Sequence, residues 1–142
     1  MLDPWYVTGF CDGAAVFTYS RSGGSYGIYF GLRQREYNTQ IVKDIYTFFN
    51  CVGSLYSGKA INVSSRSGVT QESIYFRVTK TEDLKIIVEH FDKYPLMSLK
   101  KQAAYNVWRE MVIYKSEHYR DIDANELRRL AEELSRLNSK KE

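Results

Sequence analysis

Apolar and polar residues alternate between Ser25 and Arg33, and this is the clearest structural pattern in the chain. Strict alternation is typical of a strand with one buried face. The apolar positions are Tyr26, Ile28, Phe30 and Leu32. A β-prone run from Val16 to Arg21 precedes this strand, and Gly23 and Gly24 separate the two. Because paired glycines favour tight turns, the two runs predict an antiparallel hairpin.

A helical period follows the hairpin. Asn38 is the expected N-cap of a helix that ends near Asn50, because apolar residues between them recur at every third or fourth position. These residues are Ile41, Val42, Ile45, Phe48 and Phe49. The segments 52–56 and 73–79 are again β-prone, and a loop rich in Gly, Ser and Asn joins them. They predict a third and a fourth strand.

The second half of the chain predicts three helices. Thr81 is the expected cap of the first, which ends at Tyr94, because the residue before a proline disfavours the helical conformation. Ser98 begins the next helix. Asp123, with Glu126 three residues later, is typical of a capping box and predicts the start of the last helix. Four leucines of that helix recur at every third or fourth position, and they are expected to pack on the domain's own core: Leu127, Leu130, Leu134 and Leu137.

The N-terminal segment predicts a short helix that leads directly into the first strand. Asp3 can cap it, and Pro4 suits the first helical position, where a backbone N–H would be unpaired. Gly9 and Gly13 lie on one face of this helix, although glycine costs about 1 kcal/mol in a helix interior. They indicate either a poorly formed C-terminal cap or a close helix–helix contact, including one between two chains.

The predicted order is helix, two strands, helix, two strands and helix, followed by further helices. This order defines an α+β domain, with a four-stranded antiparallel sheet and helices on one face. The length suits one hydrophobic core, and no internal repeat is visible. We therefore expect a single domain over residues 1–142, with a frayed tail at 139–142.

Composition adds limits to this picture. The net charge of +3 and the pI near 8.8 permit nucleic-acid binding without requiring it. We expect no membrane partner, because no apolar run approaches the roughly 18 residues that span a bilayer. Cys11 and Cys51 lack metal-ligand spacing, and we expect reduced thiols in a core, as in an intracellular protein. His90 and His118 lie far apart in sequence and predict no metal or catalytic site.

The nine residues from Val7 to Ala15 resemble the signature of the LAGLIDADG homing endonucleases. Three other segments support this resemblance in the same order and at similar spacing: 2–5, 90–96 and 100–103. Their likeness is to the single-motif, fungal mitochondrial branch and extends over nearly the whole chain. The resemblance implies the LAGLIDADG homing-endonuclease fold, a nucleic-acid partner (RNA or DNA) and a mitochondrial location.

One position departs from the family signature. The resemblance aligns Ala14 with the acid that binds the catalytic metal, Ala15 with a glycine, and Asp12 with a structural carboxylate. Metal-dependent phosphodiester hydrolysis needs an anionic oxygen to hold Mg²⁺, which the family uses. A methyl group cannot supply it. We therefore expect no catalytic residue, no metal site and no cofactor.

The resemblance also implies a dimer. Single-motif members pair their signature helices, and their two sheets form a saddle over DNA. We therefore expect a homodimer, or pairing with a second LAGLIDADG chain. The expected contact residues are Thr8, Gly9, Asp12 and Gly13.

Alternation and the family register together assign nucleic-acid contacts to the outward face of the sheet, to the loop after the third strand and to the start of the fourth helix. The expected residues are Thr18, Ser20, Ser22, Ser25, Tyr29, Arg33, Gln34, Arg35, Tyr56, Lys59, Arg66, Tyr75, Arg77, Lys100 and Lys101. Each cation taken alone also fits a solvated surface charge. Their expected place on one surface favours binding.

Three functions are compatible with these patterns. The first is a catalytically inactive nucleic-acid-binding protein, either maturase-like or repurposed as an RNA-binding subunit of an organellar ribonucleoprotein. The second is a homing endonuclease that is disabled by loss of its acid or depends on another chain. The third is a structural protein–protein module. The first is favoured, because Ala14 removes the metal ligand while the signals for the fold are intact.

Overall fold

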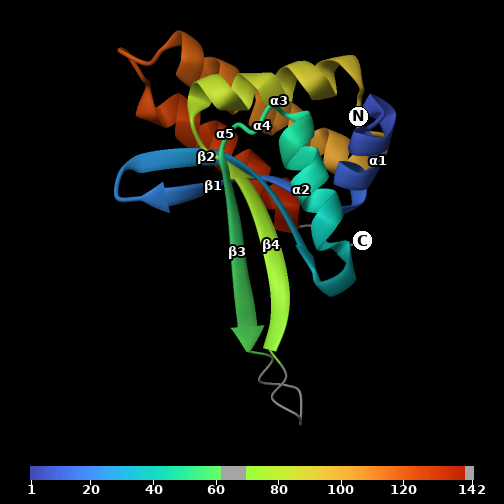
Figure 1. Cartoon of the computed structure of the whole chain (residues 1–142). Coiled ribbons are helices and arrows are strands. Elements are labelled where there is room, and N and C mark those ends of the chain that lie inside the picture. Colours follow the sequence, from blue (N-terminus) through green and yellow to red (C-terminus); the bar gives the residue numbers. More distant parts are fainter. Residues whose placement is uncertain (62–69, 140–142) are drawn as a thin grey trace.

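The helices of this protein cover one face of a four-stranded sheet (Figure 1). The computed structural model describes residues 1–61 and 70–139. The strands are β1 (Ala15–Ser22), β2 (Ser25–Arg35), β3 (Ser54–Ile61) and β4 (Thr70–Val78). The helices are α1 (Pro4–Ala14), α2 (Thr39–Phe48), α3 (Thr81–Lys93), α4 (Leu99–Glu117) and α5 (Ala124–Ser139), and a 3-10 turn, η1 (Glu36–Asn38), precedes α2. This order confirms the predicted α+β class.

Neighbouring strands of the sheet are antiparallel and follow the order β1-β2-β4-β3. Phe30, near the centre, pairs with Phe17 on β1 and with Val78 on β4. All three side chains are at most 1% exposed. The predicted alternation along β2 is confirmed, since its four apolar positions are buried. Successive side chains of a strand point to opposite faces, so the same register determines which residues point outward.

Aromatic rings fill much of the space between the sheet and the helices. The ring of Phe17 contacts those of Phe30, Phe91, Tyr105 and Trp108 at centroid distances of 5.1 to 5.5 Å. Burial of one such ring stabilises the folded state by about 1.5–3 kcal/mol. The indole Nε1 of Trp108 also donates to the carbonyl of Tyr29 at 2.9 Å, so α4 is bound to β2 by a polar contact as well.

The start and end of α1 follow the sequence prediction. The Asp3 carboxylate accepts from the backbone N–H of Trp5 at 2.8 Å, and Pro4 occupies the first turn. The helix ends where Ala15 adopts an extended conformation, with φ of −82° and ψ of 157°, and this residue begins β1. The signature helix therefore passes into the sheet without a loop.

Other predicted helix starts differ in detail. Thr81 is the first residue of α3 and not its cap, since Lys80 holds that position without a side-chain bond. Asn38 does precede α2, but its amide donates to Gln34 and not to the helix. The carboxylate of Asp123 accepts from the N–H of Asn125, whereas Glu126 bonds Arg129. The capping box of α5 is therefore only half formed.

The third strand begins later than predicted. Asn50 and Cys51 have φ values of 59° and 58°, so the chain turns before it can enter the sheet. A Cβ on Gly53, whose φ is 76°, would lie 2.4 Å from the Arg77 carbonyl. Glycine is therefore required for this close approach to β4. Cys51 is exposed in this turn, so its expected place in a core is wrong, whereas Cys11 is buried.

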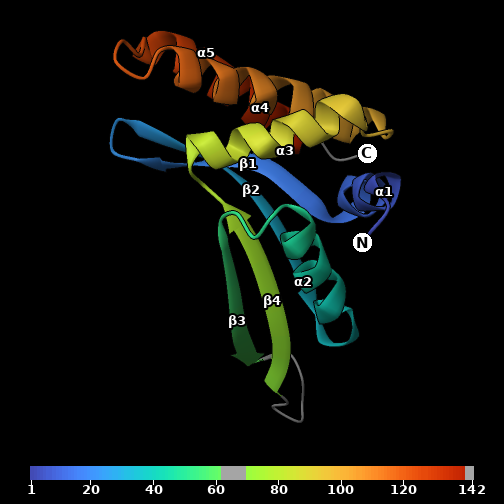
Figure 2. The same cartoon turned by 45° about the horizontal axis from the view of Figure 1, so that its top comes forward.

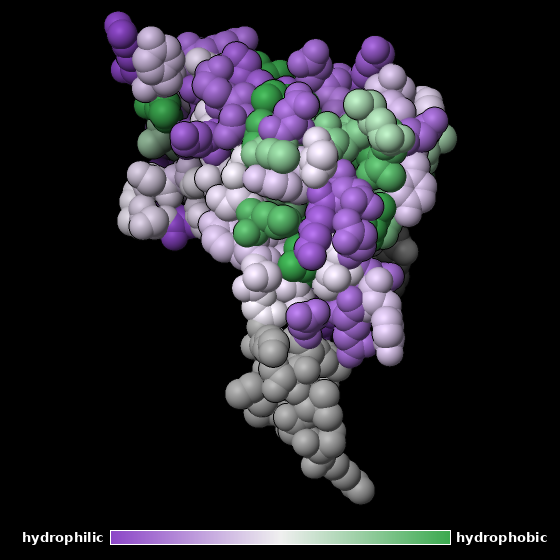
Figure 3. Space-filling model, viewed as in Figure 1, coloured by the Kyte–Doolittle hydropathy of each residue, from purple (hydrophilic) through white to green (hydrophobic). Residues whose placement is uncertain are grey.

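The helices cover one end of the sheet more completely than the other. In Figures 1 and 2, α3, α4 and α5 lie together over one end of the sheet, while β3 and β4 extend away from them. On the face seen in Figure 3, hydrophilic side chains surround small apolar groups. Among the described helices, none combines the length and apolarity needed to cross a bilayer. The expected frayed tail begins with Ser139, the last residue of α5, and its other residues lie outside the described part.

A buried polar network connects α1 to α3. The Thr8 hydroxyl donates to the Tyr94 carbonyl at 2.8 Å, and its oxygen lies 3.0 Å from Nε2 of His90. Because its only proton goes to Tyr94, the Thr8 hydroxyl accepts from Nε2–H of His90. The rings of Phe48 and Phe49 also contact His90, which is 9% exposed. Burial lowers the pKa of His90 from 6.5 to about 4.

We expect acid to destabilise the fold through His90. The unfolded chain binds a proton near pH 6.5 and the folded chain only near pH 4, so stability is lost as the pH falls between these values. The free energy of unfolding should decrease by about 2 kcal/mol between pH 7.5 and pH 5. Urea denaturation at several pH values measures this slope. His90→Gln should reduce it, whereas His118→Gln, at an exposed histidine, should leave it unchanged.

Candidate nucleic-acid interface

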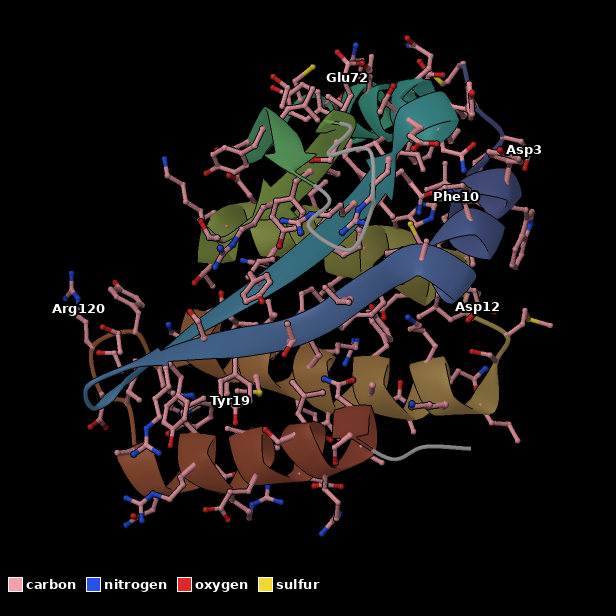
Figure 4. The ribbon with its side chains drawn as sticks, turned by 90° about the horizontal axis from the view of Figure 1, so that it is seen from below. Asp3, Phe10, Asp12, Tyr19, Glu72 and Arg120 are labelled. Atoms are coloured by element: carbon pink, nitrogen blue, oxygen red, sulfur yellow. The ribbon has the colours of Figure 1, made fainter. Side chains whose placement is uncertain are left out.

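The face of the sheet opposite the helices carries small residues, tyrosines and arginines. Figure 4 looks at this outward face: the β1 and β2 ribbons cross in front, and α4 and α5 lie along the outer edge of β1. Its members are the strand residues that alternate with the buried ones. They are Val16, Thr18, Ser20, Ser22, Ser25, Gly27, Tyr29, Gly31, Arg33, Arg35, Ser54, Tyr56, Gly58, Ser73, Tyr75 and Arg77.

Most of the residues expected to contact nucleic acid therefore share this outward face. Gln34 does not, because it pairs with buried Ile74 and accepts from the side-chain amide of Asn38 at 3.3 Å. Its expected outward position is wrong, since alternation places it on the helix side. Arg66 lies outside the described residues. Lys59 pairs with Glu72 through the strand backbone, and its side chain is not described.

Two arginines on the outward face lie over tyrosine rings. The Arg77 guanidinium is 4.0 Å from the centroid of Tyr29, and that of Arg33 is 4.7 Å from Tyr75. Such cation–π contacts contribute about 0.5–2 kcal/mol and hold the guanidinium groups in place. Nε of Arg77 is buried and lacks a hydrogen-bond partner among the described residues. Burial is the main cause that raises the pKa of Tyr75, so this hydroxyl stays protonated at neutral pH.

The end of α1 is bound to the start of α4. The Asp12 carboxylate accepts from the backbone N–H of Ser98 at 3.0 Å and from its hydroxyl at 2.8 Å. Asp12, on α1, therefore fixes the N-cap residue of α4, whose own side chain makes no bond to the first turn of that helix (Figure 4). The ammonium of Lys101 donates to the carbonyl of Ala15, directly beside Ala14. Both contacts join the signature helix to α4.

A cavity of about 700 Å³ opens beside the end of α1. Its wall includes Gly13, Lys100 and Lys101, and it shares Thr18 and Tyr29 with the outward face. Lys100 is exposed, whereas burial lowers the pKa of half-buried Lys101. The two lysines expected from the sequence therefore lie beside the sheet but in different environments. Only Lys100 is freely accessible to a phosphate.

The groups at the end of α1 do not fit a divalent metal ion. Mg²⁺ prefers anionic oxygen ligands in an octahedral arrangement. Ala14 offers a methyl group, the Ala15 carbonyl is bonded to an ammonium, and the Asp12 carboxylate is engaged by Ser98. Within residues 1–61 and 70–139, no group of three His, Cys, Asp or Glu side chains is arranged to hold an ion.

The face of α1 that carries Gly9 and Gly13 is open. Both glycines are exposed, and a Cβ on either would meet nothing within 4 Å in the described chain. Trp5 and Tyr6 on the same helix are each 52% exposed. Thr8 differs, because it is 1% exposed and bonded inside the chain, so its expected role in contact with a second chain is wrong. Asp12 is half-buried and engaged with Ser98.

Five residues of the cavity wall were not predicted as site residues from the sequence: Val16, Phe17, Ser98, Ala104 and Asn138. Asn138, at the end of α5, lines it and donates from its amide to the Phe17 carbonyl at 3.1 Å. No local pattern indicates this role, because 121 residues separate the partners. Val16 lines the cavity from the outward face and is 46% exposed. Its position follows from the register of β1, which pairs Val16 with Gly31 of β2.

The chain belongs to the LAGLIDADG endonuclease family, whose sequence profile matches residues 7–112. A curated relative, described as an uncharacterized 50.9 kDa protein in ND4 intron 1 of Podospora anserina, is 29% identical over 119 residues. That match covers 79% of this chain and 24% of the relative. The chain therefore spans about a quarter of that protein's length.

Solved structures of homing endonucleases share the fold. The homing endonuclease I-TnaI is 25% identical, with a TM-score of 0.72, and the match covers 96% of this chain and 94% of that one. I-GzeII, determined in complex with its DNA target, is 20% identical with a TM-score of 0.71. There the match covers 100% of this chain but 45% of I-GzeII. The length of the described fold thus resembles that of I-TnaI.

We expect Asp12→Ala to destabilise the protein by about 1–2 kcal/mol, because the hydrogen bonds that join α1 to Ser98 are lost. Asp12→Asn should cost less, since its amide oxygen still accepts from Ser98. The free energy of unfolding, measured by urea denaturation, tests both. Asp121→Ala, at an exposed carboxylate in the turn before α5, is the control and should change stability by less than about 0.5 kcal/mol.

Proposed function

We propose that this chain is a LAGLIDADG-family protein that binds nucleic acid and does not cleave it. The observation that carries this proposal is the chemistry at the end of α1. Ala14 stands where the family resemblance puts the metal-binding acid, and the nearest carboxylate, Asp12, is bonded to Ser98. No anionic oxygen there is free to hold the divalent ion that hydrolysis in this family uses.

The outward face supports binding. Arg33, Arg35 and Arg77 provide its positive charge, and no outward residue with a described side chain is acidic. Lys100 adds a cation beside the same face. Phosphates attract such a surface by a salt-dependent, sequence-independent interaction. I-GzeII and I-AabMI, which share the fold, were each determined with DNA.

A second chain completes the proposed assembly. The open face of α1, with Gly9 and Gly13, allows close packing of two helices, either in a homodimer or with a different LAGLIDADG chain. A homodimer would bring together two copies of Ala14 and so adds no acid. Sedimentation at micromolar concentration should detect this dimer, and a purely monomeric protein would count against it.

The proposed setting is mitochondrial. The curated relative in ND4 intron 1 of Podospora anserina supports an intron-related origin. A non-cleaving member there would act as a maturase-like protein or as an RNA-binding subunit of an organellar ribonucleoprotein. Two alternatives are an endonuclease that has lost its acid or relies on another chain, and a structural module without nucleic acid.

We expect the pure protein to leave supercoiled DNA intact in the presence of Mg²⁺, because Ala14 cannot bind the ion. Agarose electrophoresis of plasmid libraries that carry random inserts measures nicking. Metal-dependent nicking by the wild-type chain would overturn the proposal. Ala14→Asp and Ala14→Glu are the informative variants: cleavage that appears in them would identify a recently disabled endonuclease. Ala14→Ser, which restores no charge, is the matched control.

Nucleic-acid affinity should decrease steeply with salt. We expect Arg35→Ala to reduce the slope of log K against log salt concentration by about 1, because it removes one phosphate contact. Fluorescence anisotropy with labelled nucleic acid measures the slope. Lys85→Ala is the control, since Lys85 is exposed on α3, on the helix side of the sheet. No measurable binding at any salt concentration would favour the structural module.

A further inference from the structure

A row of planar side chains crosses three strands of the outward face. Arg33 on β2 pairs with Tyr75 on β4, and Tyr75 pairs with Tyr56 on β3. The Arg33 guanidinium lies 4.7 Å from the Tyr75 centroid, and the two tyrosine rings are 6.3 Å apart with a 32° tilt. Tyr56 is 55% exposed, so its ring is accessible to a ligand.

Gly31 allows the Tyr75 ring to lie along the sheet. A Cβ on Gly31 would be 2.7 Å from the Tyr75 hydroxyl and 3.1 Å from a methyl group of Val16. The ring therefore extends from β4 across β2 and covers Gly31, which is buried. The Arg33 guanidinium lies over this ring, so the accessible planar groups of the row are the guanidinium of Arg33 and the ring of Tyr56. The Arg77 guanidinium likewise lies over the ring of Tyr29, at 4.0 Å from its centroid.

The same face has few groups that read base edges in a duplex. Asn and Gln read adenine with two hydrogen bonds, and Asp and Glu accept from the amino group of cytosine. None of these occurs among the outward residues with described side chains, and Gln34 points to the helix side. Two of the three outward arginines are already held over tyrosine rings. The exposed area is instead made of aromatic faces, guanidinium planes and hydroxyls.

We infer that this face is a stacking platform for unpaired nucleotides, with Tyr56, Tyr75 and Arg33 as its central row. This inference rests on the proposed function and names its substrate class. Within a duplex each base covers its neighbours, so a ring face can bind only a base that has left the stack. Single-stranded segments, loops and bulges supply such bases, and aromatic rings and Arg planes are the surfaces on which they stack. Arg35, two residues after Arg33 on the same face of β2, is placed to contact a phosphate that flanks them.

The test compares labelled strands of about twelve nucleotides in four forms: single-stranded RNA, single-stranded DNA and each annealed to its complement. Fluorescence anisotropy should give tighter binding to the single strands than to the duplexes of the same sequence. The RNA and DNA arms distinguish the two sources of unpaired bases. A 2-aminopurine at the centre of the strand should change its fluorescence on binding if that base stacks on a ring.

Tyr56→Ala should weaken single-strand binding by roughly 5- to 150-fold, the effect of removing one base–aromatic stack. Tyr56→Phe keeps the ring and should bind within about twofold of the wild type. Gly31→Ala displaces the Tyr75 ring and should weaken binding as well. Tyr119→Ala, at a tyrosine that is 68% exposed in the turn after α4, is the control and should have no effect.

Two results would overturn the platform. Duplex binding that is at least as tight as single-strand binding, with Tyr56→Ala unchanged, would do so while the proposed nucleic-acid function stands. Equal loss in Tyr56→Phe and Tyr56→Ala would assign the effect to the hydroxyl and not to stacking. Absence of binding to all four probes would instead remove the proposed function together with this inference. Thermal unfolding of each variant separates loss of binding from loss of the fold.

Discussion

The packing of Phe30 between its strand partners and under the helices is the constraint on which the outward face depends. Its neighbours Phe17 and Phe76 are equally buried, and their rings contact it. If the strands that carry these rings shifted by one residue in register, the rings would become exposed and Tyr29 and Arg77 would become buried, because strand side chains alternate between faces. Each exposed ring would cost about 1.5–3 kcal/mol. The aromatic core thereby determines which polar groups are available to a ligand.

Polar contacts from α4 and α5 hold the other critical region, the passage from α1 into β1. Ser98 engages Asp12, Lys101 binds the Ala15 carbonyl, and Asn138 donates to Phe17. These contacts use donors and acceptors around Ala14 for structure. They explain how the signature helix keeps its geometry with alanine at the position of the acid. The contacts that hold this passage therefore do not require an acidic side chain at position 14.

Predictions from the sequence were correct for contacts between neighbouring residues and less often correct for contacts between distant ones. Alternation along β2 and the capping of α1 by Asp3 are local, and both were predicted correctly. Thr81 was wrong as a cap because a suitable residue type does not guarantee the bond. Gln34 was assigned outward against its own alternation, and the register with Ile74 shows the helix side instead. Thr8 was expected at a seam but completes a buried network with His90.

The sequence by itself determined the order of elements, the family and the substitution at Ala14, because each is encoded in neighbouring residues. Only the tertiary structure decided what surrounds them. Asp12 meets Ser98 across 86 residues, and the tyrosines of the platform meet arginines on other strands. Such contacts depend on strand register and helix packing, which sum many weak interactions over the whole chain. The signature helix thus identifies the family, while its contacts with α4 determine which polar groups at its C-terminal end are already bonded within the chain.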